Sequence, residues 1–469
     1  MSLIADRYSS AAMKAIWTPQ SKVLLERELW IAVMKAQQSL GVAIPSDAIA
    51  AYEKVKNSID LDSINARERI TRHDVKARIE EFNSLAGHQF IHLGLTSRDI
   101  TENVEQLQIK NSLELVRDRT VSLLHVLAQL AARYQDQPIA GRSHNVPAQI
   151  TTLGKRFANA AQEILLAFER VEAFLSRYPM RGIKGPVGTA QDVLDLFEGD
   201  QGKVLQLETL IAKHLGFERT LAAVGQVYPR SLDYEALSCL VQLAAGPSSL
   251  ATSIRLMAGA ELVTEGFAEG QVGSSAMPHK MNTRSCERIN GLTVVLRGFA
   301  QMIAEISGDQ WNEGDVSCSV VRRVALADAF HTIDAILETT LTVLNEFGAF
   351  PAVIEREIER FLPFLASTKI LMAAVKQGAG REIAHEAIKE HSIATALDLR
   401  NGSNRNDLLD RLAGDNRIPL TKSELEALIA KPIEFAGDAQ SQINSIVKAI
   451  DILRTKYPNA LNYQAGRIL

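Results

Sequence analysis

Apolar residues recur at helical spacing over most of the 469 residues, whereas alternating strand-like runs are short and rare. This pattern predicts an all-α fold. The clearest case spans residues 96–134, where Val104, Leu107, Leu123 and Leu130 fall on one broad face. A helix of about 38 residues extends roughly 55 Å, which is longer than a small domain. We therefore expect it to lie at the centre of a long bundle or of an oligomer core.

Similar long patterns at 148–176, 231–269 and 284–309 predict further helices, the second of them broken near Gly246 and Pro247. Shorter helices with more turns precede and follow this region. We expect three helical parts: an N-terminal domain over 1–96, a central domain of long helices over 97–362, and a C-terminal domain over 363–469.

Local signals mark the ends of several helices. Thr96 and Asp99 form a predicted capping box at the start of the longest helix, and Thr421 and Glu424 form a second one. The residues 401–404 read as a turn. Apolar positions from 443 to 453 then predict a last amphipathic helix.

Charge and cysteine content exclude several classes of protein. The chain carries 51 Lys+Arg and 55 Asp+Glu, a net charge of -4, so no global positive field attracts nucleic acid or a membrane surface. The three cysteines form no CxxC pair, which argues against disulfides and thiolate zinc. The start of the chain lacks the apolar core of a secretory signal, and apolar runs stay short of roughly 20 residues. We expect a cytoplasmic protein.

The stretch 265–291, EGFAEGQVGSSAMPHKMNTRSCERING, is the most unusual one in the chain. Gly266, Gly270 and Gly273 loosen the backbone before the two serines and Lys280, and helical pattern resumes at about Arg284. The serines are Ser274 and Ser275. Such a loop can close over a ligand and present a hydroxyl, an ammonium group and free N–H groups at a helix start. The alternative is a solvated connector, which is what Gly/Ser-rich composition usually means.

Three further stretches carry groups suited to acid–base or anion chemistry. His144 is expected between a turn and a long helix, where its ordinary pKa of about 6.5 suits proton transfer. Arg72, His73 and Asp74 stand together, and Thr96 and Ser97 offer hydroxyls at a helix N-terminus. Each has a plain structural alternative: a bystander histidine, a solvated first turn and a helix cap.

Metal and nucleotide-cofactor chemistry have no support in the pattern. His385 and His391 lie six residues apart, on different faces of a helix, and neither an HExxH motif nor a glycine-rich dinucleotide fingerprint is present. We expect a reaction without cofactor or metal, in which His, Ser and Lys are the working groups.

The segments LGLTSRD, GRSHNVPAQITTLGKRF and GSSAMPHKMN, in this order, resemble the fumarase/aspartase superfamily of homotetrameric lyases. Arg7 and Tyr8, the RHDV segment and SSAMPHK are similar to the adenylosuccinate lyase family, over essentially the whole chain. The resemblance implies a C–N lyase of the amidine-lyase type. It would release fumarate from adenylosuccinate, giving AMP, and from succinylaminoimidazole carboxamide ribotide, giving AICAR.

Roles follow from the same resemblance. Ser274 would be the general base and His144 the general acid, with Glu287 orienting the histidine and His73 assisting from the nucleotide side. Lys280 would stabilise the dianion that forms on proton loss. The positions that match substrate-binding residues are Arg7, Tyr8, Arg72, Asp74, Thr96, Ser97, Gln226, Met277, Asn282, Arg288, Ser319 and Arg323.

One departure from the family pattern concerns the substrate phosphate. Gly314 aligns with a phosphate-binding arginine of some relatives, and Arg288, Arg322 or Arg323 is the expected replacement. The resemblance also implies a homotetramer in which each active site is shared between subunits.

Other interpretations remain open at this point. A sister lyase acting on argininosuccinate, on fumarate or as a cycloisomerase shares the same loop motif. A catalytically idle structural homologue and a helical binding or scaffold protein are alternatives of another class.

Overall fold

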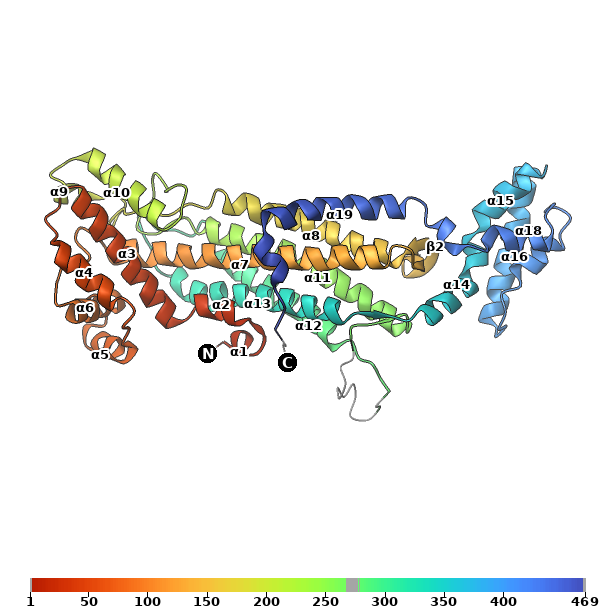
Figure 1. The fold of residues 1–469 in the computed structure, drawn as a ribbon, viewed down its shortest axis with the longest axis horizontal. Helices are drawn as coiled ribbons and strands as arrows, with labels where there is room; N and C mark the ends of the chain where they lie inside the picture. Colours follow the sequence, from red (N-terminus) through yellow and green to blue (C-terminus); the bar gives the residue numbers. More distant parts are fainter. Residues whose placement is uncertain (1, 267–276, 278, 467–469) are drawn as a thin grey trace.

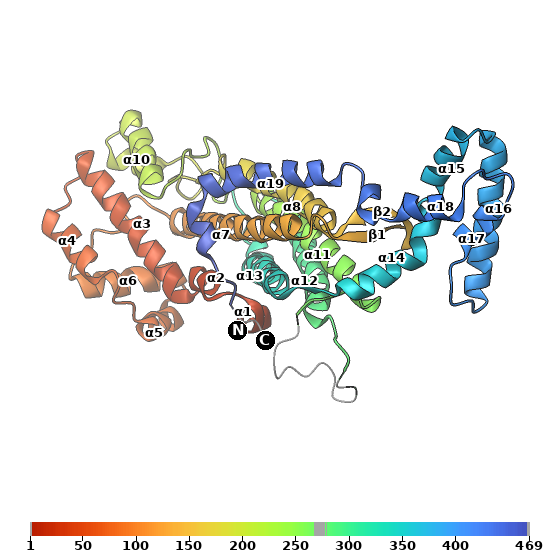
Figure 2. The same cartoon turned by 45° about the vertical axis from the view of Figure 1, so that its right-hand side comes forward.

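The computed structural model describes residues 2–266, 277 and 279–466, which form an elongated and almost entirely helical molecule (Figure 1). Long helices make up its middle, and groups of shorter helices lie at both ends (Figure 2). Within the described residues the strands form only two small two-stranded sheets. The predicted all-α class is confirmed, as is the bundle of long helices.

The helices fall into three groups along the long axis. One end contains α3 to α6, α9 and α10, with α1 and α2 leading into the bundle; their bounds are Leu3–Tyr8 (α1), Ala11–Ile16 (α2), Pro19–Ser39 (α3), Ser46–Val55 (α4), Leu61–Thr71 (α5), Asp74–Ala86 (α6), Gln191–Leu196 (α9) and Gln201–His214 (α10). The bundle contains Ser97–Arg133 (α7), Leu153–Leu175 (α8), Ser231–Gly259 (α11), Arg284–Glu305 (α12), Cys318–Glu346 (α13) and Ala439–Lys456 (α19). The other end contains Pro351–Leu365 (α14), Ser367–Lys376 (α15), Arg381–Arg400 (α16), Leu408–Ala413 (α17) and Lys422–Ile429 (α18), and short 3₁₀ helices span Pro432–Phe435 (η1) and Pro458–Asn462 (η2).

The helix α7 is the longest of the bundle and begins with the predicted capping box of Thr96 and Asp99. It packs against α3, α8, α13 and α19. Consecutive residues near its start are buried, including the polar Asp99, Glu102 and Asn103. The sequence predicted that one face of α7 is buried, but the buried surface is wider, because neighbouring helices cover α7 on nearly all sides.

The expected break in the 231–269 helix is absent. The helix α11 runs through Gly246 and Pro247 without interruption, and it ends at Gly259, ten residues earlier than expected. A Cβ atom on Gly246 would lie 2.5 Å from Cγ1 of Ile164 on α8, so this glycine allows the two helices to approach closely. The helix α12 likewise ends at Glu305 rather than at 309.

By length and composition, α11 is the one described helix that could cross a membrane. More than half of its most apolar window is buried inside the molecule. It lies between α8, α12 and α13 (Figure 1). Its apolar surface is therefore largely covered by the bundle, as in the core helix of a globular protein.

The predicted helix over 148–176 was wrong in its first residues. The segment Val146–Thr152 is strand β2 and pairs antiparallel with β1, Pro138–Ser143, and the second sheet pairs Val263–Thr264 (β3) with Gly348–Ala349 (β4). His144 and Asn145 form the two-residue turn of the first hairpin, with φ of 51° and 61°. Positive φ at both positions is typical of the tight turn that matches strand twist. The histidine therefore lies at a hairpin tip, and helix α8 begins only at Leu153.

The C-terminal region has two parts. Helices α15 to α18 enclose their own apolar cluster, from Ala366 to Leu425. The capping box of Thr421 and Glu424 is present, as predicted, and the last long helix, α19, returns to pack on α7 and α8. The boundaries of the three expected domains stay a prediction.

Candidate active site

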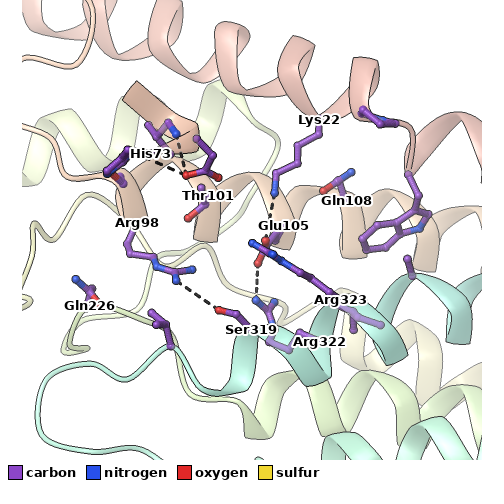
Figure 3. A pocket seen from close by; sticks show the side chains of 18 of the residues that line it. Lys22, His73, Arg98, Thr101, Glu105, Gln108, Gln226, Ser319, Arg322 and Arg323 are labelled. Atoms are coloured by element: carbon purple, nitrogen blue, oxygen red, sulfur yellow. Dashed lines mark hydrogen bonds and ion pairs between the residues drawn. The ribbon is translucent and has the colours of Figure 1, made fainter. Parts of the chain in front are cut away.

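A cavity of about 640 Å³ lies at one end of the bundle, between α3, α6, α7 and α13 (Figure 3). It brings together residues that are far apart in the sequence. The predicted site residues that line it are His73, Asp74, Thr96, Ser97, Gln226, Ser319 and Arg323. Polar lining residues that the sequence analysis did not select are Thr18, Lys22, Arg98, Thr101, Glu105 and Gln108.

Several helices begin at this cavity. The N-cap residues Thr18 of α3, His73 of α6 and Thr96 of α7 all line it, and Ser319 lies in the first turn of α13. Side chains cap one N–H group in the first turn of α3 and of α6, since Thr18 accepts from Ser21 and His73 accepts from Lys76, but each helix start still carries the positive end of the helix dipole. The cavity is therefore a place where an anion is stabilised before any charged side chain is counted.

Charged side chains add to this positive potential. Lys22, Arg98, Arg322 and Arg323 line the cavity together with the carboxylates Asp74 and Glu105. Burial acts to raise the pKa of Glu105, but Arg322 and Lys22 outweigh it and lower this pKa to about 2. Glu105 is therefore ionised at neutral pH.

Arg322 is buried and paired inside the protein. Its guanidinium forms an ion pair with Glu105, donates to Asp233 Oδ2 at 2.7 Å and donates to the hydroxyl of Tyr228. Its side chain is only 5% exposed. Since two carboxylates already neutralise its charge, Arg322 is less suited than Arg323 to hold a substrate phosphate. In the same part of the chain, Arg323 lines the cavity with no ion pair to a described residue.

His73 has a defined orientation at the start of α6. Its Nδ1 accepts the backbone N–H of Lys76 at 3.1 Å, and its Nε2 lies 3.3 Å from Ser97 Oγ. Because Nδ1 acts as an acceptor, the neutral ring carries its proton on Nε2 and donates toward Ser97. The imidazole therefore links the starts of α6 and α7 and presents an exposed polar edge to the cavity.

Asp74 and Thr96 are held by neighbouring side chains. Asp74 accepts from Arg78 at 2.8 Å; burial acts to raise its pKa, but the Arg78 guanidinium lowers it below the ordinary value. The backbone N–H of Thr96 donates to the buried Asp99 at 2.8 Å. Asp99 in turn accepts from Arg181 at 2.6 Å. These contacts fix the cavity wall from outside.

A second group of predicted residues lies elsewhere, between α1 and α12. The guanidinium of Arg288 stands 5.3 Å from the ring centre of Tyr8, and that of Arg7 stands 5.6 Å from it. Burial lowers the pKa of Arg288, and Tyr8 partly opposes this effect. The following Ser9 and Ser10 bond to Asp334 of α13, which anchors α1 to the bundle.

The start of α12 differs from the expectation of free N–H groups. The buried carboxylate of Glu265 accepts the backbone N–H groups of Ser285 and Cys286, both at 2.9 Å. A carboxylate from the end of β3 thus occupies the place foreseen for a ligand. Burial raises the pKa of the Cys286 thiol, and the negative charge of Glu265 raises it further.

The predicted catalytic loop is described only in part. Ser274 lies outside the described residues, as does the alternative Ser275. Lys280 and Glu287 are exposed on the surface of the single chain, close to the start of α12. Two further predicted residues of this stretch are described: Met277 and Asn282.

His144 and Arg72 stand outside the cavity. His144 is exposed at the tip of the hairpin, whose two strands pack against α14. Arg72 ends α5 in the left-handed region, with φ of 52°, which is uncommon for a residue other than glycine. The 37 residues of α7 separate Ser97 at the cavity from the hairpin by roughly 55 Å. One chain therefore does not bring His144 to His73.

The lining residues missed from the sequence gave only weak signals. Arg98 directly follows Thr96 and Ser97, so its neighbours could have drawn attention to it. Lys22 sits in the first turn of α3, and Gln108 lies in the middle of α7. Each reads locally as an ordinary polar position on a helix.

Comparisons with known proteins identify relatives over nearly the whole chain. The profile of the family described as "Lyase" matches residues 7–298, and that of "Adenylosuccinate lyase C-terminus" matches residues 363–446. Adenylosuccinate lyase of Saccharomyces cerevisiae is 34% identical over 95% of this chain and 93% of its own length. The enzyme of Schizosaccharomyces pombe is 33% identical with the same coverage.

Among solved structures, 3-carboxy-cis,cis-muconate lactonizing enzyme from Pseudomonas putida has a TM-score of 0.84 at 19% identity, covering 96% of this chain and 99% of that one. A fumarate lyase from Mesorhizobium has a TM-score of 0.80 at 20% identity, covering 94% and 98%. These likenesses establish a common fold. Since relatives above 30% identity span nearly its full length, the chain belongs to the adenylosuccinate lyase family of the fumarase/aspartase superfamily.

Proposed function

We propose that this enzyme releases fumarate from adenylosuccinate, giving AMP, and from succinylaminoimidazole carboxamide ribotide, giving AICAR. The observation that carries the proposal is the cavity in which helix starts, lysine and arginine side chains and the predicted nucleotide-side residues meet. Both substrates bear two carboxylates and a phosphate. A chain of net charge -4 has to bind such anions through local positive charge.

The reaction is a β-elimination that needs a base, an acid and stabilisation of a dianion. We assign Ser274 as the base that removes the Cβ proton, and His144 as the acid that protonates the leaving nitrogen. Proton loss beside a carboxylate leaves two negative charges on one group. Lys280 and Asn282 would stabilise this doubly charged carboxylate more strongly in the transition state than in the bound substrate, which lowers the activation barrier of the elimination.

The remaining roles concern orientation. Glu287 would hold the imidazole of His144, and His73 would act from the nucleotide side. In the described geometry, the Nε2 proton of His73 points toward Ser97, so both can bond to a substrate oxygen without rearranging the start of α7. A hydroxyl base works only in a closed site, because water would otherwise solvate it and keep its proton affinity low.

We further propose that copies of the chain assemble into a homotetramer with active sites shared between subunits. The separation along α7 supports this, since His144 and the cavity lie at opposite ends of one bundle. Exposed valines on the bundle helices also favour association: Val294 is 65% exposed on α12, and Val320 is 69% exposed on α13. We place the assembly in the cytoplasm, acting on small molecules rather than on nucleic acid or membranes, and without cofactor or metal.

The test is an assay of fumarate release from adenylosuccinate, the carboxamide ribotide and argininosuccinate. We expect turnover of the first two, loss of turnover in Ser274→Ala with substrate binding kept, and the same loss in His144→Gln. The exposed Arg381→Gln on α16 serves as the matched surface control. Turnover of argininosuccinate with adenylosuccinate left intact would establish a sister lyase instead, and full activity of Ser274→Ala would refute the assigned base.

Mixing the two inactive variants tests the shared site. If His144 and Ser274 of one site come from different chains, co-refolded mixtures contain some sites with both residues intact. Partial recovery of activity is expected on mixing. A mixture that exchanges subunits but stays inactive would argue that both residues act from the same chain.

A further inference from the structure

The cation that binds the substrate phosphate remains to be identified, and residue 314 cannot supply it. A Cβ atom on Gly314 would lie 2.6 Å from Cβ of Gln226, because the segment before α13 packs directly on residues 225–226. The backbone N–H of Gln226 also donates to the carbonyl of Glu313 at 2.5 Å. The close approach of these two backbones leaves no room for a side chain at this position.

Two of the three replacements expected from the sequence are also unsuited. Arg322 is paired with two carboxylates, Glu105 and Asp233, and also donates to Tyr228. Arg288 stands over Tyr8 and does not line the cavity. Arg323 remains, at the second turn of α13 next to Ser319, but a single flexible cation defines the position of a phosphate poorly.

Arg98 lies opposite these residues, on the first turn of α7. Its two terminal nitrogens face Glu102 Oε1 at 3.3 Å and Ser319 Oγ at 3.5 Å, and its side chain is 22% exposed to the cavity. Figure 3 shows it reaching from α7 toward Ser319 on α13. Both contacts are long for hydrogen bonds, so the guanidinium is positioned without being tightly held.

Glu102 does not fully neutralise the positive charge of Arg98. Glu102 is fully buried and already bonds to Arg230 at 2.9 Å, while its other oxygen accepts the backbone N–H of Tyr228 at 3.2 Å. One carboxylate therefore faces two guanidinium groups. The excess positive charge of this trio lies on the cavity side, at Arg98.

We propose that Arg98, together with Ser319, binds the phosphate group of the nucleotide substrate. The inference rests on the proposed function, and its new element is Arg98, which joins the substrate-binding positions Ser319 and Arg323. An oxygen placed between the two side chains accepts from the guanidinium and from the serine hydroxyl, and the starts of α7 and α13 add their dipoles. Arg323, from the same face of the cavity, adds a second positive charge.

The experiment compares adenylosuccinate with its dephosphorylated nucleoside as substrates of the wild type, Arg98→Ala and Arg98→Lys. We expect Arg98→Ala to raise KM for the nucleotide about tenfold to hundredfold, as for loss of one charge-assisted hydrogen bond. KM for the nucleoside should change little. Arg98→Lys should recover part of the affinity, and Arg381→Gln should behave like the wild type.

Product inhibition gives a second readout, which does not require the variant to cleave the dephosphorylated substrate. The inhibition constant of AMP should rise in Arg98→Ala, and that of adenosine should not. Equal losses with the phosphorylated and dephosphorylated compounds would overturn the inference and show a role toward the succinyl carboxylates or in folding. If the wild type itself fails to cleave adenylosuccinate, the proposed function fails, which is a distinct result.

Discussion

The buried carboxylate of Asp99 provides the sharpest test of how the cavity wall is built. It is fully buried and accepts from the Arg181 guanidinium at 2.6 Å, from the backbone N–H groups of Lys184 and Gly185 at 2.9 and 3.0 Å, and from that of Thr96 at 2.8 Å. One side chain therefore ties the start of α7 to the segment 181–185. We predict that Asp99→Asn both destabilises the protein and weakens substrate binding.

The magnitude follows from the charges that remain. Arg181 is itself fully buried, so removing the negative charge of Asp99 leaves a positive charge without a counterion. Breaking one partner of such a buried pair costs about 3–5 kcal/mol. The asparagine amide also turns N–H groups toward backbone N–H donors, which loses further hydrogen bonds. The free energy of unfolding per chain should fall by this amount.

The assay is urea unfolding followed by circular dichroism, with fumarate release measured on the folded variant. Asp118→Asn is the matched control, because Asp118 lies on the same helix and pairs with Arg117 at 2.9 Å but is 40% exposed. An exposed pair contributes at most about 1 kcal/mol. If Asp99→Asn costs no more than Asp118→Asn, the assignment of Asp99 as the residue that fixes this wall is wrong.

Three further predictions concern pH and close packing. Burial lowers the pKa of His92 to about 4, so as the pH falls the unfolded chain binds a proton at this histidine before the folded chain does. The free energy of unfolding should therefore fall by about 2 kcal/mol between pH 7.5 and 5. In urea unfolding at both pH values, His92→Gln should lack this pH-dependent loss. Gly314→Ala should displace Gln226 and lower kcat/KM about tenfold, and unchanged kinetics would contradict the steric argument. Gly246→Ala should cost about 1–3 kcal/mol through its clash with Ile164, and an unchanged urea midpoint would contradict the close approach of α8 and α11.

Local sequence signals predicted the parts of the fold that depend on residues within one or two helical turns. The period of apolar residues predicted the long helices, and both capping boxes form as expected, at Thr96 and at Thr421. Such interactions join residues three or four positions apart, so they are visible in the sequence itself.

The same local signals failed where distant segments meet. Gly246 and Pro247 read as a break, yet α11 continues through both, and Gly246 is the position where α8 packs closely. The strand before α8 read as helix, since the pairing of β1 with β2 is not encoded in apolar spacing alone. The free helix start expected near 284 is occupied by Glu265, which approaches from another element.

The site divides along the same line. Motif residues such as His73, Thr96 and Ser319 could be selected one by one from the sequence, and the fold then brought them to one cavity. Arg98 and Lys22 gave weaker signals, because a charged residue in a helix is usually solvated. Arg98 had only the adjacent Thr96 and Ser97 to draw attention to it, and Lys22 had no such neighbour. Only packing across hundreds of residues determines which charges face water, which are buried in pairs, and which remain directed at a ligand.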